Sequence, residues 1–143
     1  MNLGHLGLPG LCVTDAEEAA TIRDAAVQSE QQVKPVNLRE ASTSEEIINE
    51  LGSALSFPDY FGRNWDAVDE CLQDLSWIQG SEVVVFVLDA DRLLNSDCLT
   101  TINFVRTLAR ASKAWKARNL NFRIVFVGSK PLFNTVDAIL RPL

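Results

Sequence analysis

Residues 82–88 read EVVVFVL, and this uninterrupted apolar run restricts the fold more than any other feature of the chain. A strand with one face in water alternates apolar and polar residues, whereas a strand of a parallel sheet is covered on both faces and is apolar throughout. The run therefore predicts a buried strand of a parallel sheet. Residues 122–127, FRIVFV, are the predicted closing strand, which Gly128 ends.

Two shorter segments are further strand candidates. Residues 11–13 form a brief apolar run, and residues 33–38 form a second candidate that contains Pro35. Proline has no N–H to donate within a sheet, so Pro35 predicts either an edge position or a later start for that strand.

Amphipathic stretches separate these strands and predict helices. The first covers residues 16–29, and the second follows capping candidates at 42–44 and extends through Leu55. Two more are expected at 64–77 and 95–117, with a short helix in the tail at 135–140. The 95–117 helix is expected to carry on one side Leu99, Ile102, Val105, Leu108 and Ala109.

Because a helix lies between successive strands, the sequence predicts an α/β fold with a small, mainly parallel three- to four-stranded sheet flanked by helices. The length of 143 residues is typical of one domain, and no linker or repeat divides it. We therefore expect a single domain over residues 1–143.

The composition excludes several classes of function. Thirteen basic and nineteen acidic residues give a net charge of −6, which argues against direct nucleic-acid binding because phosphates need cationic partners. No apolar run approaches the about 20 residues that span a bilayer, and the first ten residues lack the pattern of a secretory signal. With one histidine, and three cysteines without metal-binding spacing, we expect no metal, no cofactor and a cytoplasmic protein.

The predicted helix at 64–77 has one acidic face. At about 100° per residue, its polar side carries Asp66, Asp69, Glu70 and Gln73, with Trp65 on the boundary. The apolar side carries Asn64, Ala67, Val68, Cys71, Leu72, Leu75 and Ile78. Arg63 is the only basic residue near it in the sequence, so the acidic face is either a solvated surface or a surface for an outside partner.

Residues 57–75, FPDYFGRNWDAVDECLQDL, resemble the signature of the barstar family, the protein inhibitors of barnase-type ribonucleases. The residues that fit the family pattern in register are Pro58, Asp59, Tyr60, Phe61, Gly62, Asn64, Asp66, Ala67, Glu70, Cys71 and Leu72. The resemblance covers residues 33–127, which leaves residues 1–32 as an extra N-terminal strand and helix and residues 128–143 as a tail. It implies a barstar-like fold.

The resemblance also implies a function. Family members place this loop and helix in the active site of a ribonuclease, where carboxylates occupy positions meant for RNA phosphates. By position, Glu70 takes the place of the main phosphate mimic and Asp66 that of the second acid. Tyr60, Phe61, Gly62 and Asn64 match the loop contacts, and Trp65, Asp69 and Gln73 complete the face. The implied protein is a non-enzymatic inhibitor of a ribonuclease or toxin with a basic cleft, plausibly an immunity protein of a bacterial toxin system.

Three positions depart from the best-known member of the family. Glu70 stands in place of an Asp, Asp69 in place of a Trp, and Ala114 in place of an acidic contact on the late helix. The surroundings of Ala114 are basic: Arg110, Lys113, Lys116 and Arg118. That surface would repel a basic ribonuclease that faced it, so barnase itself is not the expected target.

Two other functions stay open on the sequence. One is a barstar-fold binding module whose partner is not a nuclease, which the departures at Asp69 and Ala114 favour. The other is a small-molecule or catalytic site built on Asp89 and Asp91, which follow the strongest strand where α/β sheets bind ligands. Neither aspartate has a phosphate-binding loop or a partner base nearby, so both are interpreted as turn residues. Cys71, on the apolar side of its helix, is interpreted as a small buried residue.

Overall fold

The computed structural model describes residues 2–6, 10–59, 61–80 and 82–141. Its strands are β1 Asn2–His5, β2 Leu11–Thr14, β3 Gln32–Asn37, β4 Glu82–Leu88 and β5 Asn121–Val127. Its helices are α1 Ala16–Gln28, α2 Ser44–Ala54, α3 Trp65–Asp74, α4 Cys98–Ala117 and α5 Lys130–Leu140, with a 3-10 helix, η1, at Ala90–Asn95.

The five strands form one sheet in the order β1-β2-β5-β4-β3. The four strands from β2 to β3 in this order are parallel, with Val85 opposite both Lys34 of β3 and Ile124 of β5. The predicted α/β fold with a mainly parallel sheet is therefore confirmed. Pro35 lies in β3, at the edge of the sheet. The open side of an edge strand has no neighbouring strand, so a proline without an N–H is tolerated there.

The strand β1 was not predicted, and it pairs antiparallel with β2. Its sequence, NLGH, has neither β-branched residues nor alternation, so it carries no strand signal of its own. The described part of the chain thus has five strands instead of three or four.

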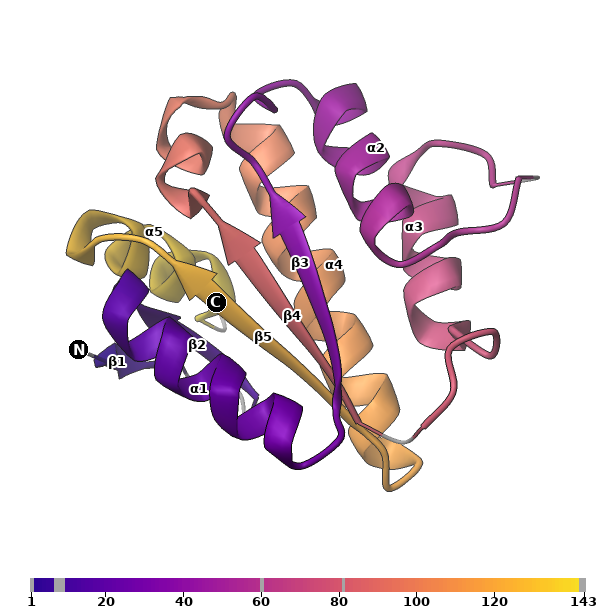
Figure 1. The fold of residues 1–143 in the computed structure, drawn as a ribbon. Helices are drawn as coiled ribbons and strands as arrows, with labels where there is room; N and C mark the ends of the chain where they lie inside the picture. Colours follow the sequence, from indigo (N-terminus) through magenta and orange to yellow (C-terminus); the bar gives the residue numbers. More distant parts are fainter. Residues whose placement is uncertain (1, 7–9, 60, 81, 142–143) are drawn as a thin grey trace.

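Helices cover both faces of the sheet (Figure 1). Val84 and Phe86 of β4 pack with α1 in one cluster, whereas Val83, Val85 and Val87 belong to the larger core with α2, α3, α4 and α5. This alternation explains why β4 is apolar at every internal position: each side chain meets a helix on one face or the other.

Several helix boundaries differ from the sequence prediction. The helix predicted at 64–77 ends at Asp74, because Leu75 takes a left-handed backbone conformation with φ 41°. The helix predicted from residue 95 begins at Cys98, since η1 precedes it and Asp97 is its N-cap. Leu99, expected on the apolar side, is 66% exposed. In the tail, α5 begins at Lys130, earlier than the predicted start at 135.

Candidate functional site

The helix α3 is fixed at its start by Asn64. The Asn64 side chain accepts a hydrogen bond from the backbone N–H of Ala67 at 2.8 Å, which satisfies one of the free donors of the first turn. Arg63, just before it, has a positive φ of 54° and donates from its guanidinium to Asn49 of α2 at 3.0 Å. The entry to α3 is therefore tied to both its own backbone and the neighbouring helix.

Aromatic side chains hold the loop before α3 against the core. Phe57 and Phe61 meet edge to face with ring centroids 4.9 Å apart, and Phe57 also meets Trp77 at 6.3 Å. The indole N–H of Trp77 donates to the backbone oxygen of Leu55 at 2.8 Å. Because Phe61 is partly buried, it offers only part of its ring to a partner.

The inner side of α3 packs against α4. Val68 and Leu72 are buried, and Trp65 meets Phe104 of α4 with ring centroids 6.4 Å apart. The indole N–H of the buried Trp115 donates to the backbone oxygen of Leu72 at 2.8 Å. All three tryptophans contact the core, Trp115 from within it and Trp65 and Trp77 from its border, and these contacts hold α3 in place.

The three carboxylates on the predicted acidic face of α3, Asp66, Asp69 and Glu70, fall into two groups. Asp69 accepts from Arg110 Nε at 3.1 Å and from Gln73 Nε2 at 3.1 Å, so its oxygens are occupied inside the chain. Asp66 and Glu70 are exposed, and the structure gives neither of them a hydrogen bond or ion pair among the described residues. We name these two the acidic ridge.

Arg110 is the functional neighbour that the sequence reasoning missed. It stands 41 residues from Asp69 in the sequence but contacts it in the folded chain. Arg63 is therefore the only basic residue near the acidic face along the chain, but Arg110 is a second one in space. The available signal was the basic composition of the late helix. Its meaning depended on which face of that helix packs beside α3.

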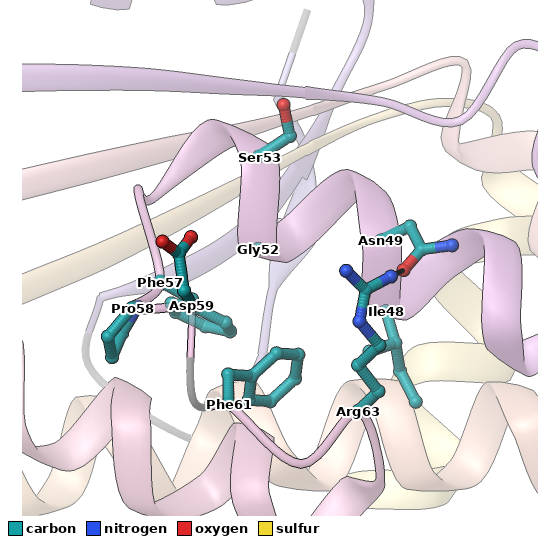
Figure 2. A pocket seen from close by; sticks show the side chains of 9 residues that line it. All are labelled: Ile48, Asn49, Gly52, Ser53, Phe57, Pro58, Asp59, Phe61 and Arg63. Atoms are coloured by element: carbon teal, nitrogen blue, oxygen red, sulfur yellow. Dashed lines mark hydrogen bonds between the residues drawn. The ribbon is translucent and has the colours of Figure 1, made fainter.

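The remaining predicted loop residues have mixed positions. Gly62 and Asn64 are exposed, and Tyr60 lies outside the described residues. A hollow of about 300 Å³ opens between the loop and α2, and Figure 2 shows Phe57, Phe61, Asp59 and Arg63 around it. It lies beside the loop, next to the start of α3.

At the alternative site at the end of β4, Asp91 is engaged by hydrogen bonds within the chain. Asp91 Oδ1 accepts from the backbone N–H and the hydroxyl of Ser129, at 2.9 and 2.8 Å. Asp89 has a left-handed backbone conformation at the start of η1. These features fit the interpretation of both residues as turn residues.

The Cys71 thiol of α3 is poorly suited to nucleophilic attack. Burial raises the pKa of the Cys71 thiol, with Asp74 and Glu70 adding to the shift, so the thiolate needed for attack is scarce at neutral pH. The described ranges hold no group of three potential metal ligands among His, Cys, Asp and Glu. Within the same ranges, no helix is both long and apolar enough to cross a membrane.

The fold and the site together define a small α/β protein that holds a rigid, outward-facing acidic helix beside an aromatic loop. The model of the Barstar (barnase inhibitor) family matches residues 31–127, well over half of the chain. The chain therefore belongs to the barstar family, whose members are non-enzymatic inhibitors. Membership suggests a function like that of a barnase inhibitor.

Among solved structures, the chain is similar to the Aeropyrum pernix ORC1 protein in complex with DNA. The TM-score is 0.55 at 15% identity, and the match covers 98% of this chain but only 39% of that one. This likeness is one of fold alone. No curated protein matches the chain.

Proposed function

We propose that this protein inhibits a barnase-type ribonuclease by placing Glu70 and Asp66 in the cleft that binds RNA phosphates. The observation that carries the proposal is the acidic ridge itself. It consists of two exposed carboxylates that have no hydrogen bond or ion pair with any described residue, on a helix that the core holds in place. Such a cleft is lined by cations, so a carboxylate at the right spacing replaces a phosphate oxygen.

Rigidity supports the proposal. The Asn64 cap and the bond from Trp115 to Leu72 fix α3 before any partner arrives. A surface that is ordered in advance loses less conformational entropy on binding, so more of the interaction energy appears as affinity. Around the ridge, Gly62, Asn64 and the exposed parts of Phe61 and Trp65 are the proposed contacts of the loop, together with Tyr60.

The biological setting belongs to the same proposal. An inhibitor of a ribonuclease protects the RNA of the cell that makes the enzyme, so we place this protein in the cytoplasm as the immunity partner of a bacterial toxin. The partner is then a ribonuclease toxin with a basic active-site cleft.

The test is inhibition of RNA cleavage across a panel of purified barnase-type ribonucleases, followed with a fluorogenic RNA substrate. At least one enzyme is expected to be inhibited at a one-to-one ratio. For that enzyme, Glu70→Gln should raise Kd at least about 30-fold, which corresponds to the roughly 2 kcal/mol of a hot spot. Barnase and its own inhibitor are a reference pair for such hot spots, so this threshold is carried over from related complexes.

Two variants sharpen the test. Asp66→Asn should weaken inhibition in the same direction but less, because Asp66 lies nearer the start of the helix. Asp74→Asn is the matched control: Asp74 is an exposed carboxylate at the end of α3, off the centre of the ridge, and should change Kd less than about 2-fold. A panel without any inhibited enzyme, or unchanged inhibition by Glu70→Gln, contradicts the proposal.

A second candidate is a binding module for a partner that is not a nuclease. The pairing of Asp69 with Arg110 favours it, because it places a cation at the border of the acidic face. An inactive panel together with a stable one-to-one complex with a protein that is not a nuclease would establish this candidate instead.

A further inference from the structure

A row of cations lies on the outward face of α4. Arg106, Arg110 and Lys113 are exposed and stand at i, i+4 and i+7, a spacing that puts them on one side of a helix. Arg110 is paired with Asp69, whereas the structure gives Arg106 and Lys113 no hydrogen bond or ion pair among the described residues. We name these three residues the basic ridge.

The basic ridge runs alongside the acidic ridge. The helices α3 and α4 pack together and point the same way, because Asp69, Leu72 and Gln73 meet Arg110, Trp115 and Arg118 in that order. Arg106 therefore lies toward the start of α3, where Asp66 is, and Lys113 lies toward its end. The ion pair between Asp69 and Arg110 marks the line where the two ridges meet.

A partner seated on the acidic ridge must also cover the basic one. A stable protein interface buries about 800 Å² on each partner, a patch about 30 Å across. Packed helices lie about 8–10 Å apart, so a patch centred on α3 extends over α4. A partner that is basic throughout would gain at Glu70 and lose at Arg106 and Lys113, since like charges across an interface are costly.

We propose that the basic ridge selects a ribonuclease whose surface beside its basic cleft is acidic; this rests on the proposed inhibition of a ribonuclease through the acidic ridge. Arg106 and Lys113 then pair with carboxylates on the rim of the partner while Glu70 and Asp66 enter its cleft. The same cations reject enzymes that carry basic residues at that rim. The partner surface that fits both ridges is therefore basic in the cleft and acidic on the rim beside it.

The shape and lining of the basic ridge fit a protein better than RNA. A hollow of about 340 Å³ between α4 and α5 is lined by Arg106, Ala109, Arg110, Lys113, Ile139, Leu140 and Arg141. The lining offers cations above an apolar floor and has no aromatic ring on which a base could stack, and stacking is a main source of affinity for single-stranded RNA. A chain segment with both acidic and apolar side chains suits it.

Barnase serves as the probe, since its substrate site is basic and the basic ridge is expected to act against it. Arg106→Glu and Lys113→Glu should each tighten barnase binding at least about 5-fold at low salt, because repulsion becomes attraction. The gain should shrink at high salt as the charges are screened. The matched control is Arg23→Glu, which makes the same change of charge on α1, across the sheet, and should change affinity less than about 2-fold.

The outcomes separate this proposal from the proposed function. The selection by the basic ridge is overturned if neither Arg106→Glu nor Lys113→Glu gains affinity for barnase, and this includes the case in which no variant binds. It is also overturned if the control Arg23→Glu gains as much affinity as these two variants. Glu70→Gln in the Lys113→Glu protein reports on the proposed function by itself: unchanged affinity contradicts the role of Glu70 and leaves the ridge effect standing. Binding of a labelled uridine decamer that is lost in Arg106→Glu would assign the ridge to RNA and also overturn the proposal.

Discussion

Three carboxylates of α3 look equivalent along the sequence, but their environments differ. The Asp69 side chain is 28% exposed and its oxygens accept from Arg110 and Gln73, whereas Asp66 and Glu70 are exposed and have no such bonds within the part of the chain that the structure describes. An ion pair this close to the surface adds at most about 1 kcal/mol to stability. The ion pair also changes the charge of the surface, because Arg110 neutralises one negative charge on the face proposed to meet a partner.

Gly128 joins the last strand to α5 at a point with no room for a side chain. A Cβ atom there would lie 2.5 Å from Leu132 Cδ2 and 2.8 Å from Asp91 Oδ1, the oxygen that holds Ser129. Gly128→Ala should therefore lower the free energy of unfolding by about 1–3 kcal/mol, because the buried Leu132 or the Asp91 carboxylate must shift. Urea denaturation followed by circular dichroism measures the loss.

Gly52→Ala is the control for that substitution. Gly52 lies inside α2, and a Cβ atom there would meet Phe57 at 3.4 Å, an ordinary contact distance. Alanine in a helix is favoured over glycine by about 0.5–1 kcal/mol, so Gly52→Ala should raise stability. If Gly128→Ala proves as stable as the unaltered protein, the close packing between Asp91, Ser129 and α5 is wrong.

At the scale of elements, charged caps fix the starts of α2 and α4. The backbone N–H groups of Ser42 and Thr43 hold the pKa of Glu46 below its ordinary value of 4.5, in a capping box at the start of α2. The hydroxyl and the backbone N–H of Thr100 hold the pKa of Asp97 below 3.8 at the start of α4. The Glu46 and Asp97 carboxylates accept these hydrogen bonds more strongly when they are ionised than when they are protonated.

These caps predict a loss of stability in acid. Because both pKa values are lower in the folded chain, the unfolded chain takes up protons first, and the free energy of unfolding falls as the pH drops below about 4.5. Asp97→Asn keeps the cap but removes its charge, so it should reduce this slope while stability at pH 7 changes little. Urea midpoints between pH 7 and 3 measure it.

The control for the acid slope is Glu50→Gln, which removes an exposed carboxylate of α2 that forms no hydrogen bond with the residues described by the structure. It should leave the slope of the unaltered protein in place. An Asp97→Asn protein with the full slope would show that the cap of α4 does not contribute to the acid response.

At the scale of the whole molecule, a net charge of −6 combines with the exposed carboxylates of the acidic ridge. Association with the inhibited ribonuclease should slow by about 10-fold or more between low and high salt, because steering acts through a field with a Debye length of about 8 Å at physiological ionic strength. Dissociation should change less. Barnase and its inhibitor are a standard case of such steering, so the expectation follows that precedent.

Stopped-flow measurements of the association rate test this prediction. The control is Glu70→Gln, which should lower the association rate at low salt and reduce its dependence on salt. Rates that stay flat from low to high salt in the unaltered protein would contradict electrostatic steering by the acidic ridge.

Most of the fold could be read from local patterns. The apolar run of β4 predicted a strand covered on both faces, Pro35 predicted an edge position, and Thr43 with Glu46 marked the start of α2. These features depend on the residues of one segment, and periodicity and capping are local effects. The barstar signature at 57–75 likewise lies within one loop and helix, so the sequence by itself indicated the family.

Only the tertiary structure decided what surrounds those segments. The strand β1 exists because β2 offers it an edge, and Leu99 is exposed because η1 shifts the start of α4. The availability of Glu70, the engagement of Asp69 and the basic ridge beside them all depend on how α4 packs against α3. The physical reason is that contacts such as the one between Asp69 and Arg110 join residues 41 positions apart, and packing, not local pattern, brings them together.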